Sequence, residues 1–305
     1  MHKLRFGVLA AVAVALAWLF GFGGMADISA WAAEQQRSTQ TALAQGLRAV
    51  RAGEPGAWLA LMGVCAAYGF FHAAGPGHGK LVIGGYGAAA RVTAWRLSGL
   101  AVASSLAQAV MAIVLVALGA FVLGWGRTEL TDTAERVLAP ASYAAIALVG
   151  LWLLLRGARR VWSVARSQAD HAHTHDHDHD HTDGHCHTCG HAHGPTVEEA
   201  AAVTSWRDAV AIVASIAIRP CTGAVFLLIL CFGLGIPLAG ISGALVMGLG
   251  TASVTVLVAL AAVGARTSFL ANWSGAGALR AMALIEIAAG GLIALVATAL
   301  LLPLI

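Results

Sequence analysis

Long runs of apolar residues are the feature that most constrains how this chain of 305 residues can fold. Hydrophobic residues make up 59% of the sequence and charged residues only 11%, and the mean hydropathy is +0.78. A helix that crosses a membrane needs about 20 predominantly apolar residues. The composition excludes a soluble domain and predicts an all-α polytopic membrane protein. The candidate spans are residues 6–25, 57–74, 97–123, 139–155, 208–232, 236–264 and 281–304.

The first apolar segment differs from the others in its flanks. Lys3 and Arg5 precede it, and small residues at positions 30–33 follow it, as in a secretory signal peptide. Its apolar run is longer than a usual signal core, which favours a retained anchor. We therefore interpret residues 1–25 as a transmembrane anchor or signal peptide. Residues 26–56 are then expected to form a periplasmic amphipathic segment.

The six remaining segments predict a core of two three-helix repeats. Residues 57–155 form the first repeat, residues 207–305 form the second, and residues 156–206 form the loop that joins them. Because each repeat has three spans, the second must run opposite to the first. Pro76 and Pro220 interrupt the first helix of each repeat. Interruptions at matching positions of inverted repeats point to a transport site.

The distribution of basic residues favours one orientation in the membrane. With the N-terminus inside, the inside loops hold 12 of the 18 Lys and Arg residues, the outside segments hold five, and Arg219 falls within a helix. By the positive-inside rule, this bias places the loop over residues 156–206 in the cytoplasm, as expected for a bacterial inner-membrane protein. The net charge of +3 follows from this topology and gives no reason to invoke nucleic acid.

The predicted cytoplasmic loop is rich in side chains that bind transition metals. Residues 171–193 read HAHTHDHDHDHTDGHCHTCGHAH and hold ten of the 13 histidines. Neutral imidazole, thiolate and carboxylate are ligands for such cations, and a tract this polar is expected to be solvated. A polar linker without metal is the alternative. The candidate ligands are His171, His173, His175, His177, His179, His181, His185, Cys186, His187, Cys189, His191 and His193.

A second candidate metal site ends the helix predicted over residues 57–74. The sequence there reads FFHAAGPGHGK, and it contains His72, Pro76 and His78. Two histidines six positions apart do not share a face of an unbroken helix, but the Gly-Pro-Gly sequence between them is expected to break it. Such a break can turn both imidazoles towards one cavity. The alternative is a turn at the membrane interface that simply ends the helix.

These residues resemble the NicO-type nickel/cobalt transporters, a group that includes bacterial nickel/cobalt efflux proteins. The resemblance continues at Arg219-Pro220-Cys221-Thr222-Gly223, which is similar to the family's R-P-C-[ST]-G element. Residues 247–252, MGLGTA, are similar to its M-x-[LI]-G-T-[AG] element and include Thr251. The match extends from about Trp58 to the C-terminus, and a His-rich cytoplasmic loop is typical of the family.

The resemblance implies a secondary transporter that moves Ni²⁺ or Co²⁺, and not an enzyme. Zn²⁺ stays open as a further substrate. No permanently bound cofactor is expected, and the expected partners are the metal ion and the lipid bilayer.

The chain lacks the P-loop sequence, so ATP is not the direct energy source. A metal-collecting loop in the cytoplasm favours export. Known nickel/cobalt permeases carry H-x₄-D-H in this helix, and Gly77 stands where they have Asp.

Two charged residues fall at membrane depth, where an unpaired charge costs several kcal/mol. Arg219 lies near the middle of one predicted helix, and Glu286 lies within another. We expect them to interact and to hold or gate the helices, together with Pro76, Pro220 and Thr251.

Two other classes of function remain open from the sequence. Zinc transporters of the cation-diffusion type also carry a His-rich tract, but they use His/Asp sets in two helices, and the helix over residues 57–74 has no Asp. A membrane thiol-disulfide electron carrier would use Cys65 and Cys221, one in the first helix of each repeat. That interpretation leaves the His-rich loop unexplained.

Overall fold

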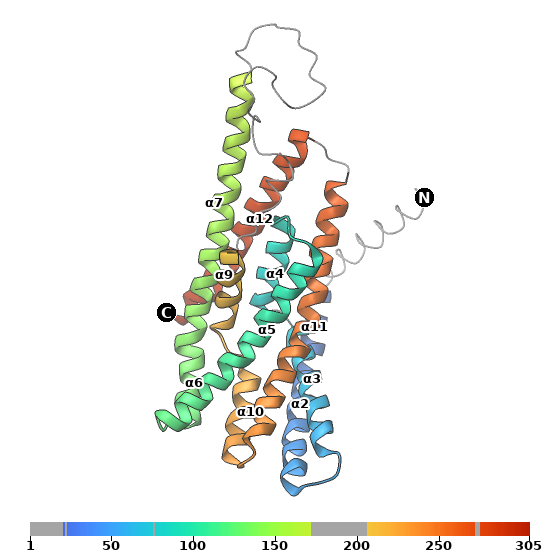
Figure 1. The fold of residues 1–305 in the computed structure, drawn as a ribbon, viewed down its shortest axis with the longest axis vertical. Coiled ribbons are helices and arrows are strands. Elements are labelled where there is room, and N and C mark those ends of the chain that lie inside the picture. Colours follow the sequence, from blue (N-terminus) through green and yellow to red (C-terminus); the bar gives the residue numbers. More distant parts are fainter. Residues whose placement is uncertain (1–20, 22, 76, 172–205, 272–274) are drawn as a thin grey trace, which may run out of the picture. The chain divides into compact units, whose positions relative to one another are not determined.

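All regular structure in the part of the chain that the structure describes is helical (Figure 1). The computed structural model describes residues 21, 23–75, 77–171, 206–271 and 275–305. Within them, five helices are long and apolar enough to cross a membrane, and a bent pair of helices makes up to six spans. This confirms the predicted all-α polytopic membrane protein. The predicted N-terminal anchor and the His-rich loop beyond His171 lie outside the described residues.

The six predicted core helices are found close to their predicted positions. The bent pair is formed by α9 and α10, and it corresponds to the segment that contains Pro220. Two helices, α2 (Gly24–Ala52) and α4 (His78–Ala89), lie outside the spans. The first three spans are α3 (Ala57–Ala74), then α5 (Ala94–Ala117) with its π-helical extension η1 (Leu118–Val122), and then a continuous span that begins with α6 (Arg127–Asp132) and η2 (Thr133–Leu138) and continues into α7 (Ala139–His171). The others are α9 (Trp206–Ala217) with α10 (Thr222–Gly233), α11 (Pro237–Leu270), and α12 (Gly275–Leu301) with η3 (Leu302–Leu304).

Helix α7 extends well past its predicted end at Leu155. The helix continues to His171, because the residues after Leu155 include many good helix formers and no proline. Arg156 and Arg160, which were assigned to a loop, therefore project from a helix. They are four residues apart and lie on the same helix face.

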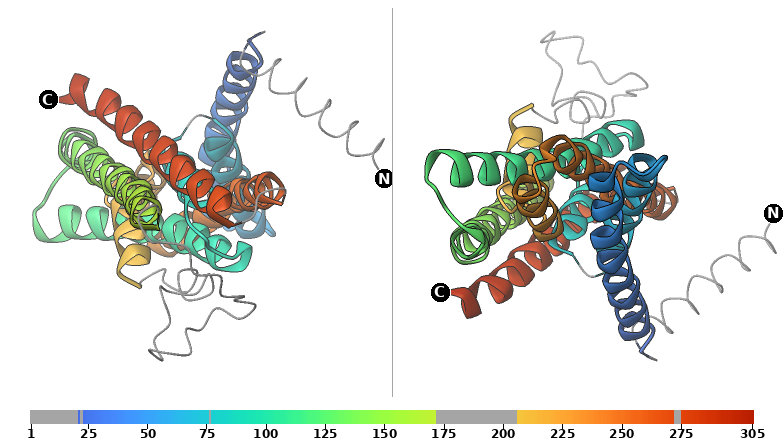
Figure 2. Two further views of the ribbon diagram at one scale, coloured as in Figure 1. Left: turned by 90° about the horizontal axis from the view of Figure 1, so that it is seen from above. Right: turned by 90° about the horizontal axis from the view of Figure 1, so that it is seen from below.

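The segment expected between the anchor and the core is a helix, α2, which is not among the candidate spans. It packs against α3 as an antiparallel hairpin (Figures 1 and 2). Leu43 and Leu47 of α2 are buried in the same cluster as Leu61 of α3. Gly53 and Gly56 carry positive φ angles at the connection, a conformation that glycine adopts without steric cost. The periplasmic location of this hairpin stays a prediction.

The described helices form two compact units. The first combines the described residues within 1–79, 101–139 and 217–257, and the second combines the described residues within 80–100, 140–216 and 258–305. Each unit draws on both halves of the sequence. The inverted relation between the two predicted repeats stays a prediction.

The first unit has an apolar core in which helices approach closely through glycines. Tyr68, Leu227 and Met247 are almost completely buried there. A Cβ atom at Gly69 of α3 would lie less than 3.0 Å from the Met247 carbonyl of α11, and one at Gly250 would lie less than 3.0 Å from the carbonyl of Ala66. Small residues that permit such backbone contact are a common basis of helix packing in membranes.

The second unit uses the same kind of contact between α7 and α12, which cross in Figure 2. A Cβ atom at Gly150 or at Gly290 would fall within 3.0 Å of backbone atoms of the other helix. Arg266 of α11 donates hydrogen bonds to the carbonyls of Gly87 and Ala90 at the end of α4, and to that of Val92 beyond it. The arginine therefore satisfies carbonyl groups that the end of a helix leaves open.

Candidate functional site

The first helix break lies just after His72. Helix α3 ends at Ala74, Gly75 has an extended conformation, and α4 begins at His78. The break that the Gly-Pro-Gly sequence predicted is therefore confirmed. His72 is half-buried in the last turn of α3. Pro76 and the side chain of His78 lie outside what the structure describes, so the predicted pairing of His72 with His78 stays a prediction.

The second break separates α9 from α10. The chain leaves the helix after Ala217, bends by 61° and re-enters helix at Thr222. Proline cannot donate a backbone hydrogen bond and disfavours helix in the residue before it, which explains a break at Arg219 and Pro220. Pro220 is buried and Arg219 is half-buried. This break was also predicted from the sequence.

Both breaks meet within the first unit. The Cys221 thiol, in the second break, is within hydrogen-bonding reach of the His72 imidazole at the first. The ring of Tyr68 stacks on the same imidazole, with centroids 5.9 Å apart and planes 9° from parallel. Tyr68 precedes His72 by four residues, so the two share a face of α3. An imidazole, a thiol and a phenol ring thus gather where two helices are interrupted.

Two further helices fix the position of the Tyr68 ring. Gln36 of α2 donates a hydrogen bond to the Tyr68 hydroxyl at 3.1 Å, and Gln40 donates another at 3.5 Å. On α10, a Cβ atom at Gly223 would lie less than 3.0 Å from the Tyr68 ring. Any larger residue at Gly223 would displace the ring. The glycine of the R-P-C-[ST]-G element therefore makes room for a side chain of α3.

The third sequence element reaches the same place from α11. The Thr251 hydroxyl donates a hydrogen bond to the Gly69 carbonyl at 3.2 Å, three residues before His72. Together with the close contact of Gly69 and Met247, this bond holds α11 against α3. The three motifs found in the sequence thus converge in space, although the residues that meet, Gly69 and Thr251, are 182 positions apart in the chain.

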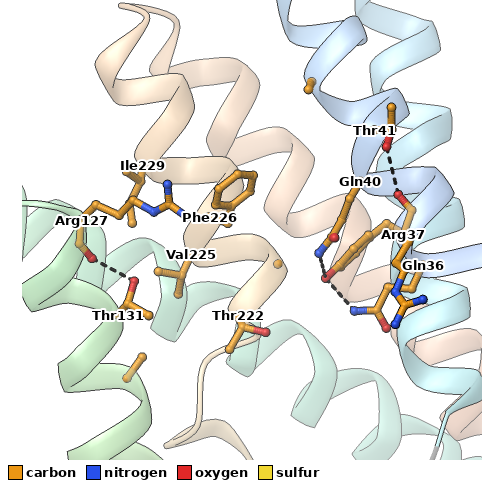
Figure 3. A pocket seen from close by; sticks show the side chains of 14 residues that line it. Gln36, Arg37, Gln40, Thr41, Arg127, Thr131, Thr222, Val225, Phe226 and Ile229 are labelled. Atoms are coloured by element: carbon orange, nitrogen blue, oxygen red, sulfur yellow. Dashed lines mark hydrogen bonds between the residues drawn. The ribbon is translucent and has the colours of Figure 1, made fainter. Parts of the chain in front are cut away.

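A cavity of about 640 Å³ lies beside the Tyr68 side chain, and Figure 3 shows several of the other residues that line it. Gln36, Gln40 and Arg37 line it from α2, and Thr222 lines it from α10. The Arg127 guanidinium, from α6, packs 5.1 Å above the Phe226 ring at the opposite wall. Tyr68 also lines the cavity, so one ring contacts both the cavity and His72. No local sequence pattern indicates this cavity, because its wall comes from five separate elements, α2, α3, α6, η2 and α10.

The structure corrects the predicted partner of Glu286. Its side chain is completely buried, and it pairs with Arg156 and with Arg160, the latter at 3.0 Å. Arg156 also lies 4.0 Å from Asp208. The prediction chose Arg219 because it treated Arg156 and Arg160 as loop residues. In α7 they lie on one helix face, where both guanidinium groups reach the same carboxylate.

The described residues contain no group of three or more His, Cys, Asp and Glu side chains placed to hold a metal ion. The contact of His72 with Cys221 is therefore a pair of potential ligands, and further ligands must come from elsewhere. Of the loop ligands, only His171 is described, as the last residue of α7. The remaining His and Cys residues of the loop lie outside the described residues.

The cysteine pair required for an electron carrier is not formed. Cys65 and Cys231 are neighbours in the apolar core, whereas Cys221 contacts His72. All three are free thiols. The different surroundings of Cys65 and Cys221 do not favour a thiol-disulfide carrier.

Comparison with known proteins gives two matches. A family model described as "NicO: High-affinity nickel-transport protein" matches residues 58–197. A protein of Haemophilus influenzae, provisionally described as a nickel/cobalt efflux system, is 26% identical over 259 residues, covering 82% of this chain and 79% of its own length. No solved structure matches the chain significantly.

Proposed function

We propose that the chain is a NicO-type nickel/cobalt transporter, as its motifs predicted, and that it exports Ni²⁺ or Co²⁺ across a bacterial inner membrane. The family model and the relative from Haemophilus influenzae support this proposal. The observation that carries this proposal is the meeting of two broken helices at His72. Interrupted helices expose backbone groups that no longer bond within the helix, and such groups serve as ion sites in many secondary transporters.

In this proposal His72 and His78 bind the ion during its passage. A neutral imidazole is a ligand suited to Ni²⁺ and Co²⁺. Pro76 and Pro220 keep the two helices interrupted, and Arg219 repels a bare dication at the break and so serves as a gate. Thr251 supports the site through its bond to the Gly69 carbonyl.

The His-rich loop, residues 171–193, captures the ion before transport. Ten histidines on a cytoplasmic loop would raise metal occupancy near the entrance, and each imidazole would release the ion readily. Capture requires neutral imidazole, so it should weaken below pH about 6.5, where histidine becomes protonated.

The first test is the metal content of cells that express the protein and are loaded with Ni²⁺, Co²⁺ or Zn²⁺. The wild type is expected to lower cellular Ni²⁺ or Co²⁺, and His72→Ala is expected to abolish this effect because it removes a ligand. His78→Ala tests the second proposed ligand. Glu34→Gln is a matched control, because Glu34 forms only an exposed pair with Arg37.

Three results would count against the proposal in different ways. An increase in cellular metal would indicate import through the same site. Full activity in the His72→Ala variant would remove the helix break as the transport site. No change of any metal in cells that make folded wild-type protein would contradict metal transport itself.

A further inference from the structure

We propose that Cys221 is a metal ligand, and that Cys221 and His72 give the two helix breaks a mixed nitrogen–sulfur site for borderline and soft dications. This inference rests on the proposed function, since it assigns the ligand chemistry of that transport site. It changes the expected ligand set, which contained only imidazole groups from the first break.

The spacing of the two side chains suits a shared metal ion. Zn²⁺ binds imidazole nitrogen at about 2.0–2.1 Å and thiolate sulfur at about 2.3 Å, so two such ligands of a tetrahedral ion are about 3.5 Å apart. A hydrogen-bonded imidazole and thiol have a similar separation, and Cys221 and His72 are within that reach. A dication can therefore take the position of the shared proton with little movement of either side chain.

The position of Cys221 suits a sulfur ligand. Cys221 is the N-cap residue of α10, so it lies at the end of the helix where the first backbone amide groups are exposed. The first amides of a helix carry partial positive charge because they have no partner within the helix. When a dication binds, the thiol proton leaves to solvent and the sulfur stays as thiolate.

A thiolate also supplies negative charge that the first break lacks. The sequence FFHAAGPGHGK contains no carboxylate, so the first break brings no negative charge to a bound ion. A dication held only by neutral imidazole groups keeps its full charge in a medium of low dielectric constant. Cys221, just before the start of a different helix, α10, would supply that negative charge.

The surroundings separate Cys221 from the other described cysteines. Cys65 and Cys231 are completely buried in the apolar core of the first unit, where a thiol acts as a small apolar side chain. Cys221 lies outside any helix, and the next two residues, Thr222 and Gly223, line the cavity. Tyr68 lines the same cavity and its ring stacks on His72, so the cavity lies close to the proposed ligand pair.

Sulfur ligation predicts which ions the site selects. Thiolate prefers soft and borderline ions, whereas Mg²⁺, Ca²⁺ and Mn²⁺ favour oxygen ligands. A site made of imidazole and thiolate should therefore accept Ni²⁺, Co²⁺ and Zn²⁺ and reject Mg²⁺. With two protein ligands, the remaining positions are open to water, which allows the ion to be released.

The test measures protection of the Cys221 thiol by metal in the purified full-length protein. Cys65 and Cys231 are replaced by alanine and Cys186 and Cys189 by serine, so that Cys221 is the one reactive thiol. Co²⁺ or Ni²⁺, at about ten times the dissociation constant, should slow alkylation of Cys221 by a maleimide about tenfold. Mg²⁺ should have no effect, and His72→Ala should remove the protection.

A matched control keeps Cys231 in place of Cys221 as the single cysteine. Cys231 lies on the same helix, α10, but it packs in the apolar core, so metal should not change its alkylation rate. Unchanged alkylation of Cys221 with all of these metals would overturn the inference. Protection that persists in His72→Ala would also overturn it, because the two residues would then not share an ion.

Transport measurements separate a failure of this inference from a failure of the proposed function. If Cys221 is a ligand, Cys221→Ser should lower export of Ni²⁺ and Co²⁺ by about 10–100-fold, while folding stays intact by size-exclusion chromatography. Full export by folded Cys221→Ser, with no export by His72→Ala, would reject the cysteine ligand and retain the transporter. The alkylation result does not depend on export, so it decides the ligand question even if the wild type moves no metal.

Discussion

Glu286→Gln should destabilise the protein and lower its melting temperature in detergent. The substitution keeps the shape of the side chain but removes its charge, so Arg156 and Arg160 lose their shared carboxylate. Removing one member of a fully buried ion pair costs about 3–5 kcal/mol, because the remaining charge is left uncompensated. Arg160 is 47% exposed and Arg156 keeps its contact with Asp208, so we expect a loss below that range, measured as the monodisperse fraction and as thermal unfolding.

The surface pair Glu34–Arg37 provides the control for this prediction. Its side chains are 70% and 77% exposed, so Glu34→Gln should change the free energy of unfolding by no more than about 1 kcal/mol. A double variant, Glu286→Gln with Arg160→Gln, should recover part of the lost stability, because Arg156 keeps a contact with Asp208. Equal, small effects of Glu286→Gln and Glu34→Gln would contradict a structural role of the buried pair.

Helices and their interruptions were predictable from the sequence because they depend on local physics. The length of the apolar segments predicted the six core spans. The breaks at Pro76 and Pro220 were predictable because proline has no backbone N–H to donate and because it disfavours helical dihedral angles in the residue before it. The partner of Glu286 was not predicted correctly, because the sequence analysis ended the helix at Leu155 and so placed Arg156 and Arg160 in a loop. The four-residue spacing of these two arginines is typical of one helix face and indicates that the helix continues.

The composition of the site was predictable only in part. His72 was identified by the helix break beside it, and Thr251 by its motif. The contact of His72 with Cys221 depends on how two segments far apart in the chain pack, and no local pattern reports such packing. Tyr68 was missed although it precedes His72 by one helical turn, where a side chain on the same face is expected.

Gly69→Ala is expected to disrupt the packing of α3 against α11. The added methyl group would lie less than 3.0 Å from the carbonyl oxygen of Met247, and the neighbouring backbone atoms of Met247 leave it no space. Overpacking of a well-packed core costs about 1–3 kcal/mol when side chains can adjust. Here the obstacle is backbone, so the effect should reach or exceed the upper end of that range, seen as a lower melting temperature.

Gly63→Ala is the matched control, because Gly63 lies on the same helix and a Cβ atom there meets nothing within 4 Å. Alanine favours helix over glycine by about 1 kcal/mol, so this variant should be as stable as the wild type or slightly more stable. The two substitutions are chemically identical and lie six residues apart in α3. A difference in melting temperature between them therefore reports the contact with α11 and not the helix propensity of alanine.

The Gly69 substitution should also affect transport, for a reason that Gly63→Ala does not share. Separating α3 from α11 would lengthen the bond from the Thr251 hydroxyl to the Gly69 carbonyl and move Tyr68 and His72, which lie on either side of that turn. We expect the small amount of folded Gly69→Ala protein to export metal less well per molecule than the wild type. Equal melting temperatures and equal export for Gly69→Ala and Gly63→Ala would show that α3 and α11 do not meet at these residues, and the convergence of the three motifs at His72 would lose its structural basis.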